Sequence, residues 1–248
     1  KIELNRRMSE TLEQMARALF KSWFVDFEPV RAKMEGRWRR GESLPGMPAH
    51  LYDLFPARLV DSELGEIPEG WEVDKMGNQF RITMGQSPPG STYNEKGEGL
   101  PFYQGRVDFG FRFPVRRVFC TAPRRFAEAG DTLVTVRAPV GDVNMALERC
   151  AIGRGVAAVR HATGSRSYTY YIVRSLKPLF KNFEAEGTVF GTINKEAFAS
   201  IKCAVPPTRL VEQFEALCKP LDAQIETNEL ESRTLAALRD ALLPKLIS

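Results

Sequence analysis

The first 24 residues carry an apolar side chain at every third or fourth position. Leu4, Met8, Leu12, Met15 and Leu19 follow this spacing, which places them on one face of a helix. Neither glycine nor proline occurs before residue 29. The pattern predicts an amphipathic helix of about 24 residues, roughly 36 Å long at about 1.5 Å per residue.

A second helical pattern occupies the end of the chain, from about residue 209 to residue 246. Its seam consists of Phe214, Leu217, Leu221, Ile225, Asn228, Ser232, Leu235, Leu238 and Leu242. The mean step of about 3.5 residues is typical of coiled coils, in which a polar seam residue such as Asn228 commonly fixes the register.

The two helical segments are also related in sequence. When "IELNRRMSETLEQMARALF" is shifted by 223 positions onto "IETNELESRTLAALRDALL", eight positions are identical. Matching amphipathic helices at both ends predict an antiparallel coiled coil, formed either within the chain or between copies.

Between the helices the chain is rich in turns. Residues 36–70 are crowded with glycine and proline, which predicts a linker or irregular connection. Short apolar runs such as "DTLVTVRAPV" and "GRGVAAVR" predict strands, whereas "SRSYTYYIVRSLKPLFK" favours a helix through Lys181. "NKEAFASIKCAVPP" predicts a short helix capped by Asn194, then a strand that ends at Pro206.

These elements predict an α+β fold, with one mixed α/β domain between two long helices. The predicted boundaries are a helix at 1–35, a linker at 36–63, a globular domain at 64–207 and a helix at 208–248. In "FGFRF", alternation places Phe109, Phe111 and Phe113 on one face, towards the core, and Arg112 on the other.

Charge is unevenly distributed along the chain. The formal net charge is +4, but residues 81–202 contain 13 arginines and 5 lysines against 10 acidic residues, a balance of +8. The rest of the chain therefore carries −4. A basic, arginine-rich middle favours a polyanionic partner for this region.

Sequence signatures of catalysis are missing. The chain has no GxxxxGK[ST], GxGxxG or GxSxG motif, and only two histidines. Its four cysteines form no CxxC pair, which favours reduced thiols and argues against a zinc site or other metal site. No apolar run approaches the roughly 20 residues of a membrane span. The composition thus indicates a cytoplasmic protein that binds a partner and has no catalytic residues.

Several motifs, taken in order, resemble type I restriction–modification specificity subunits. They are "LGEIPEGWEVDKMG" with its Ile-Pro-x-Gly-Trp segment, the Gly187-Thr188 loop, the strand at 201–205, the Pro206-Pro207 break and the Glu212-Gln213 helix. "ARALFKSWFVDFEPV" and "RTLAALRDALLPKLIS" resemble the conserved helices of that family. The resemblance covers nearly the whole chain and rests on the order and spacing of the motifs.

The resemblance implies a DNA-recognition subunit without catalytic activity. In this family, each recognition domain reads one half of a split site in double-stranded DNA, and antiparallel helices hold two such domains apart. Two modification subunits supply S-adenosylmethionine and methylate adenine, so no cofactor is expected in this chain. Restriction subunits then join the complex. A family member usually has two recognition domains; this chain has one, which leaves open a fragment or a half-subunit that pairs with a second copy.

The expected DNA contacts combine amide and guanidinium groups, which match base edges, with groups that bind phosphates. The nominated residues are Gln86, Ser87, Tyr93, Gln104, Arg106, Arg112, Arg116, Arg117, Arg137, Asn144, Arg154, Thr192, Asn194 and Lys195. Helix pairing or subunit docking is assigned to Leu4, Met8, Leu12, Met15, Leu19, Leu221, Ile225, Asn228, Leu235, Leu238 and Leu242. The alternative function is a scaffold of such a complex that reads no DNA; a self-contained methyltransferase or nuclease is opposed by the missing motifs.

Overall fold

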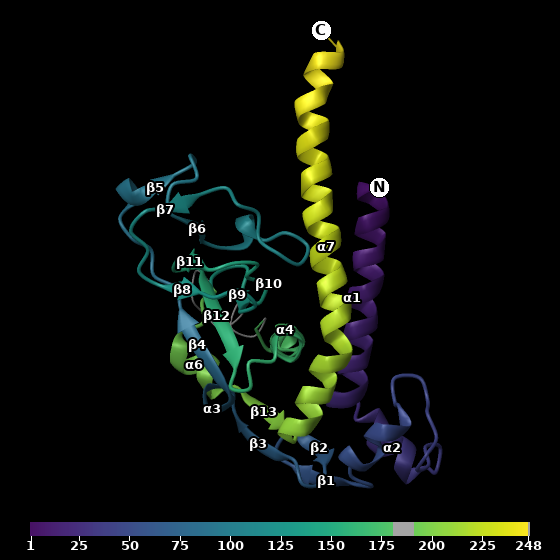
Figure 1. Cartoon of the computed structure of the whole chain (residues 1–248). Helices are drawn as coiled ribbons and strands as arrows, with labels where there is room; N and C mark the ends of the chain where they lie inside the picture. Colours follow the sequence, from purple (N-terminus) through teal and green to yellow (C-terminus); the bar gives the residue numbers. More distant parts are fainter. Residues whose placement is uncertain (181–190, 248) are drawn as a thin grey trace.

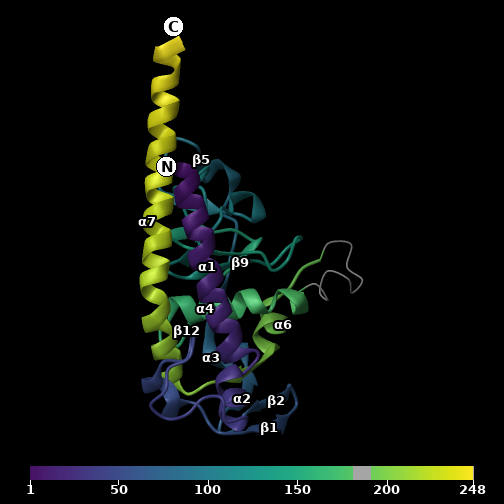
Figure 2. The same cartoon turned by 90° about the vertical axis from the view of Figure 1, so that its right-hand side faces the viewer.

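Two long helices run side by side in opposite directions, and a globular domain packs against one side of the pair (Figure 1; Figure 2). The computed structural model describes residues 1–180 and 191–247. Helix α1 spans Ile2–Phe24 and helix α7 spans Thr208–Ile247. The α+β fold and both terminal helices are therefore confirmed, and the antiparallel pair forms within one chain.

The globular domain is built on a four-stranded antiparallel sheet of order β10-β9-β12-β4. A five-stranded sheet of order β5-β7-β6-β11-β8 lies beside it, and β1-β2 and β3-β13 form two further pairs. The strands are β1 Leu59–Ser62, β2 Gly65–Pro68, β3 Glu72–Lys75, β4 Phe80–Met84, β5 Tyr93–Asn94, β6 Leu100–Tyr103, β7 Phe119–Cys120, β8 Phe126–Ala127, β9 Thr132–Thr135, β10 Val143–Met145, β11 Cys150–Ile152, β12 Val156–His161 and β13 Lys202–Val205.

Successive side chains of β12 point to opposite faces of the sheet and pack into two different cores. Ala157 and Val159 pack into the large core that includes Tyr168 of α4, whereas Val156 and Ala158 pack with Ile152 of the five-stranded sheet. The shorter helices are α2 Glu28–Met34, α3 Met76–Gln79, α4 Arg166–Ser175 and α6 Lys195–Ser200, with 3₁₀ turns at Ala49–Leu54, Gly90–Thr92 and Arg106–Asp108. The four-stranded sheet thus lies between the helices and the second sheet.

The strand and cap patterns of the domain are confirmed. β9 and β12 fall within the two predicted apolar runs, and the side chain of Asn194 caps α6 by accepting a hydrogen bond of 2.8 Å from the Ala197 N–H. Helix α4 occupies the predicted helical stretch. Its predicted continuation to Lys181 and the Gly187-Thr188 loop lie outside the described residues.

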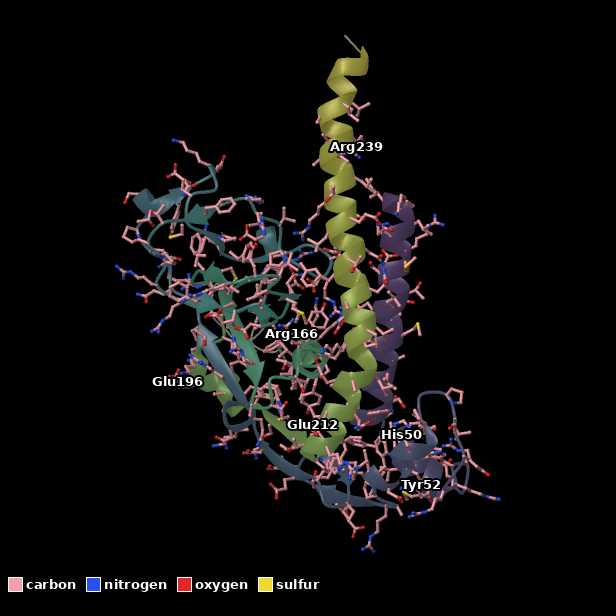
Figure 3. The ribbon with its side chains drawn as sticks, in the orientation of Figure 1. His50, Tyr52, Arg166, Glu196, Glu212 and Arg239 are labelled. Carbon is pink, nitrogen blue, oxygen red and sulfur yellow. The ribbon has the colours of Figure 1, made fainter. Side chains whose placement is uncertain are left out.

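The predicted linker is irregular but densely packed. Trp38, Leu51 and Phe55 are buried in the main core, and the Trp38 and Tyr52 rings meet edge to face at 5.0 Å. The Lys33 ammonium group lies 3.8 Å from the centre of the Tyr52 ring. Figure 3 shows Tyr52 and His50 in this packed region beside the start of α7. The predicted boundary at residue 64 falls in the turn of the β1–β2 hairpin.

The face of α1 that meets α7 differs from the predicted one by a single residue. The predicted seam residues Leu4, Met8 and Met15 are 60%, 39% and 55% exposed. The buried residues are instead the ones that follow each predicted position: Asn5, Ser9, Glu13, Ala16 and Phe20. One residue corresponds to a rotation of about 100° around the helix axis. The assignment of these three side chains to helix pairing within the chain is therefore wrong.

The other predicted seam residues divide along the helices. Leu12 and Leu19 are partly buried against the core, as is Leu221, and Ile225 and Asn228 are buried in the pair. Leu235 is partly buried, whereas Leu238 and Leu242 are each 53% exposed. Their stretch of α7, which includes Arg239, extends past the start of α1 (Figure 3), so these two leucines have no partner helix within the described residues.

Near the start of α1 the seam between α1 and α7 is polar, and its hydrogen bonds are reciprocal. The Asn5 side-chain amide donates to Ser232 Oγ at 3.3 Å, and the Asn228 amide donates to Ser9 Oγ at the same distance. Asn228 and Ser232 are the residues that match Asn5 and Ser9 under the 223-residue shift. The matched helices therefore exchange equivalent contacts, as two related segments in an antiparallel pair should.

Near the end of α1 the seam is aromatic. Phe20, Trp23 and Phe24 of α1 each lie within 6.0 Å of the Phe214 ring on α7, measured between ring centres. Trp23 also donates to the Gly46 carbonyl at 2.8 Å, which satisfies its indole N–H. None of the helices in the described part of the chain is long and apolar enough to cross a membrane.

Truncating the observed seam should destabilise the fold, whereas truncating the predicted stripe should not. We expect Phe20→Ala to lower the free energy of unfolding by about 3–5 kcal/mol, because it removes a buried ring from the aromatic contact. Met15→Ala on the exposed face should change it by less than about 0.5 kcal/mol. Urea denaturation of both variants measures the difference, and equal losses would show that the stripe is the packed face.

Candidate nucleic-acid interface

A tight turn, Gly153-Arg154-Gly155, brings several nominated residues together between β11 and β12. A Cβ on Gly85 would lie 2.1 Å from the Gly153 carbonyl oxygen, and one on Gly155 would lie 2.2 Å from the Gln104 carbonyl oxygen. Neither contact is compatible with a side chain. The glycines therefore allow the segments that carry Gln86, Gln104 and Arg154 to approach one another.

Backbone hydrogen bonds hold these segments in place. The Gln86 N–H donates to the Ile152 carbonyl at 3.0 Å, and the Arg154 N–H donates to Ser87 Oγ at 3.2 Å. On the other side of the turn, the Val136 N–H donates to the Gly155 carbonyl at 2.9 Å. An isolated bridge then pairs Arg137 with Thr192.

The resulting surface, which we name the GRG edge, comprises Gln86, Ser87, Gln104, Arg137, Arg154 and Thr192. Gln86, Gln104, Arg137 and Arg154 are exposed. Their side chains have no hydrogen-bond or ion-pair partner among residues 1–180 and 191–247. Two free amides and two free guanidinium groups, gathered from four segments around the turn, are the donors and acceptors that base edges require.

The other exposed nominated residues are partly engaged. Arg106 pairs with Asp142 at 2.8 Å, and Arg116 pairs with Glu148 at 2.6 Å. Arg117 donates to the Val107 carbonyl at 3.4 Å. Exposed ion pairs of this kind contribute little to stability, so a stronger acceptor can displace them at little cost.

Two nominated residues at the end of the region have local tasks. Asn194 caps α6 and Lys195 is the first residue of that helix, exposed to solvent.

The nominated residue Tyr93 has a structural role. Its hydroxyl donates to the Pro88 carbonyl at 2.7 Å, and its ring centre lies 4.8 Å from that of Phe102. Tyr93 therefore supports the loop that precedes the five-stranded sheet.

The nomination of Arg112 and Asn144 as DNA contacts is wrong, because each side chain is only about 1% exposed. Asn144 donates to the Gly110 carbonyl at 3.1 Å. The segment around Arg112 is a tight turn and not a strand, so alternation fails there: Phe111 is 41% exposed and Arg112 points inward.

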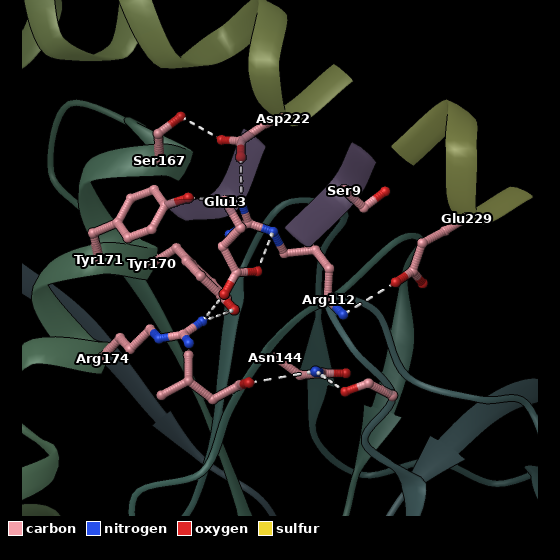
Figure 4. Close-up of polar contacts among 12 residues, drawn as sticks. Ser9, Glu13, Arg112, Asn144, Ser167, Tyr170, Tyr171, Arg174, Asp222 and Glu229 are labelled. Atoms are coloured by element: carbon pink, nitrogen blue, oxygen red, sulfur yellow. Dashed lines mark hydrogen bonds and ion pairs between the residues drawn. The ribbon is translucent and has the colours of Figure 1, made fainter. Parts of the chain in front are cut away.

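Arg112 is the centre of a buried polar network that joins the domain to both long helices (Figure 4). Its guanidinium group pairs with Asp222 of α7 and lies 3.8 Å from a carboxylate oxygen of Glu13 of α1. The Tyr171 hydroxyl accepts a hydrogen bond from it at 3.0 Å, and the Tyr170 ring centre lies 3.9 Å away. Both tyrosines belong to α4.

The network extends through both of its carboxylates. Glu13 also pairs with Arg174 of α4, and Asp222 accepts from the Ser167 hydroxyl at 2.6 Å. Burial opposes the charged form of Arg112, but the tyrosines and carboxylates around it outweigh this effect and raise the pKa of the guanidinium. The group therefore stays charged and needs its partners.

The buried cysteines show no features of reactive thiols. Burial raises the pKa of Cys150 to about 12 and that of Cys203 to about 11. Both thiols are therefore protonated at neutral pH, and a protonated thiol is a poor nucleophile and metal ligand. Cys120 and Cys218 are also free and buried.

Comparison with known proteins connects this architecture to one family. No family model matches the chain. Over 191 residues it is 37% identical to a Methanocaldococcus jannaschii specificity subunit named for the type I restriction enzyme MjaX, covering 75% of this chain and 45% of the relative. It is 25% identical over 299 aligned residues to the HindI specificity subunit of Haemophilus influenzae, covering 100% of this chain and 63% of the relative.

A solved structure extends the likeness to the fold. The HsdS subunit from Thermoanaerobacter tengcongensis matches with a TM-score of 0.55 and 31% identity, over 99% of this chain and 56% of that one. The chain belongs to the specificity subunits of type I restriction enzymes. It spans about half the length of the curated relatives it matches. The prediction that it is not an enzyme is confirmed at the level of the family, because its relatives are specificity subunits.

Sequence reasoning missed one group of arginines in this specificity subunit. Five of them, on four segments of the domain, surround a cavity: Arg81, Arg124, Arg125, Arg149 and Arg160. The four segments are far apart in the sequence, and no motif connects them. The only sequence signal was the alternation in "RIT", which places Arg81 and Thr83 on the same face of β4.

Removing the charge of Arg112 should destabilise this specificity subunit strongly. We expect Arg112→Met to lower the free energy of unfolding by about 3–5 kcal/mol, because Asp222 and Glu13 lose a buried counter-charge. Arg116→Met, which breaks an exposed pair, should lower it by less than about 1 kcal/mol.

A double-mutant cycle in urea tests the cause of that loss. Adding Asp222→Asn to Arg112→Met should cost less than the sum of the single changes, because the unpaired carboxylate is then neutral. Strictly additive losses would contradict a direct interaction between the two side chains.

Proposed function

We propose that this specificity subunit reads one half of a bipartite DNA site through the GRG edge. The observation that carries the proposal is the group of four exposed, unpartnered amide and guanidinium side chains, those of Arg154 in the Gly153-Arg154-Gly155 turn and of Gln86, Gln104 and Arg137 on the segments bonded to it or adjacent to it. Glutamine can bond adenine through two hydrogen bonds, and arginine can do the same with guanine. The basic balance of residues 81–202 agrees with a polyanionic partner.

The chemistry belongs to partner subunits in this proposal. A modification subunit would bind S-adenosylmethionine and methylate adenine in the site that the specificity subunit reads. Restriction subunits would join the assembled complex. The specificity subunit itself would supply position and sequence discrimination, a role that requires a rigid binding surface and no catalytic group.

The exposed apolar face of α1 is the proposed docking surface for the modification subunit. Leu4, Met8 and Met15 lie about 100° around the helix from the face buried against α7 and are exposed, whereas Leu12 and Leu19 of the same stripe are partly buried. A stripe at helical spacing suits an apolar helix of a partner protein. Leu238 and Leu242 add apolar side chains on the extended part of α7.

A scaffold without DNA readout remains the alternative function. The exposed stripe on α1 favours it as much as it favours the proposal, because docking alone would need that surface. The GRG edge separates the two functions, since a pure scaffold has no use for free amide and guanidinium groups gathered around a glycine-tight turn.

Changing one side chain of the GRG edge should relax recognition at one base position. We expect Gln104→Ala, combined with the modification subunit, to weaken binding to the cognate site by about 1–3 kcal/mol, roughly fivefold to 150-fold. Methylome sequencing should then show one relaxed position in one half-site. Gln14→Ala, an exposed glutamine on α1, serves as the control and should leave the motif unchanged. Unchanged motifs for Gln86→Ala, Gln104→Ala and Arg154→Ala would sink the readout proposal.

Charges on the α1 stripe should block docking without unfolding the chain. We expect Met8→Lys with Met15→Lys to abolish copurification with the modification subunit, because a partner's apolar surface would have to bury two ammonium groups. Glu3→Gln with Gln14→Lys adds the same net charge on exposed positions that lie about 80° or more around the helix from each stripe residue. Circular dichroism should be unchanged in both variants. If the stripe variant copurified with the modification subunit as the wild type does, the docking surface would lie elsewhere on the chain.

A further inference from the structure

We propose that the arginine pocket, formed by Arg81, Arg124, Arg125, Arg149 and Arg160, is a phosphate-binding site that holds the DNA backbone beside the GRG edge. This inference rests on the proposed function and deepens it. The five side chains come from β4, β12 and the segments that precede β8 and β11, and they surround a cavity of about 300 Å³.

The pocket has more positive charge than its own carboxylates balance. Glu128 and Asp131 are the acidic residues that line it, so five arginines leave an excess of three positive charges. The side chains of Arg81, Arg124 and Arg125 have no hydrogen-bond or ion-pair partner in the described residues. Like charges gathered in one concavity repel each other, and an anion that fills it removes the repulsion.

The two acidic residues orient the arginines rather than neutralise the pocket. Asp131 is buried and receives two hydrogen bonds from Arg160, at 2.5 and 2.9 Å, and one from the Glu128 backbone N–H at 2.8 Å. This pairing raises the pKa of Arg160 and fixes its plane. Arg149 lies over the Phe126 ring at 4.7 Å and contacts Glu128 at 3.4 Å.

Guanidinium groups held in fixed planes match phosphate oxygens. Arginine binds phosphate through two parallel N–H donors, and prior ordering reduces the entropy lost on binding. Thr83 on the same face of β4 adds a hydroxyl, a further common phosphate ligand. The chemistry of the pocket is therefore that of a phosphodiester or phosphate site.

The position of the pocket favours the DNA backbone over a free anion or an acidic protein. Arg81 and Gln86 lie on β4 and its direct extension, five residues apart. An extended chain covers at most about 16 Å in five residues, so the pocket lies within about five phosphates of the proposed readers along one strand of a duplex. Arg81 and Thr83 project from the face of β4 opposite Phe80 and Ile82, which pack into the core shared with the helix pair.

The experiment compares the salt dependence of DNA binding in complexes with the modification subunit. The variant Arg81→Gln/Arg124→Gln/Arg125→Gln removes the three unpaired arginines. The control variant Arg39→Gln/Arg40→Gln/Arg58→Gln removes three exposed charges from the packed connection at the other end of the molecule. Binding of a duplex that carries the methylated motif is measured between about 50 and 200 mM salt.

We expect the pocket variant to lose about 0.9 from the slope of log affinity against log salt for each phosphate contact. Three contacts make wild-type affinity fall about 40-fold more than variant affinity over this range. The methylated motif should stay the same, and the control variant should keep the wild-type slope. Glu128→Gln, which adds one net positive charge to the pocket, should steepen the slope.

Each failure has a separate meaning. A wild-type slope in the pocket variant, with the motif still methylated, overturns the pocket and leaves the proposed function standing. Absence of sequence-specific binding by the wild-type complex sinks the proposed function itself. A changed motif would make the pocket a base reader, and loss of the modification subunit would make it a protein-docking site; both overturn the proposal. So does calorimetric binding of inorganic phosphate that the three substitutions abolish while the DNA slope is unchanged.

Discussion

The structure depends on one buried charge, the guanidinium group of Arg112. A charged group that is only 1% exposed is stable only when opposite charges and hydrogen-bond acceptors surround it. Those partners come from α1, α4 and α7, which means from both ends of the chain and from the domain between them. The helix pair and the domain therefore cannot rearrange independently without exposing or orphaning that charge. A purely apolar contact between the same elements would tolerate sliding, whereas a network of paired groups permits one arrangement.

The same logic explains why the helix pair has a polar seam near the start of α1. Asn5, Ser9, Asn228 and Ser232 make specific, reciprocal hydrogen bonds, which define the register but bury little apolar surface. Most of the packing energy comes from the aromatic end, around Phe214. Since the seam uses polar residues, the leucine and methionine stripe of α1 is left on the outside. Leu4, Met8 and Met15 are therefore not covered by the described residues, and they carry the docking surface that we propose.

Sequence periodicity predicted the helices and strands well, but it predicted poorly which face of each element packs against which partner. The length of α1, the strands β9 and β12 and the Asn194 cap follow from local patterns, and the α+β fold follows from their order. The face of α1 was wrong by one residue, because a helical stripe shows which side is apolar and not which partner covers it. Arg112 and Phe111 exchanged places because "FGFRF" is a turn, to which strand alternation does not apply. The arginine pocket was missed because its members converge only after the two sheets have formed.

The GRG edge marks the limit of local reasoning in a different way. Gln86, Gln104 and Arg154 were nominated as separate residues from separate stretches, yet Gly85 and Gly155 let their backbones approach to distances that no side chain would permit. At Gly85 and Gly155 a carbonyl oxygen lies about 2 Å from the position that a Cβ would take, so a side chain there would have to displace the backbone. The exposed side chains of Gln86, Gln104 and Arg154, in contrast, have no hydrogen-bond or ion-pair partner in the described residues. It follows that these three side chains can be exchanged without disturbing the fold or the Arg112 network, whereas the two glycines cannot.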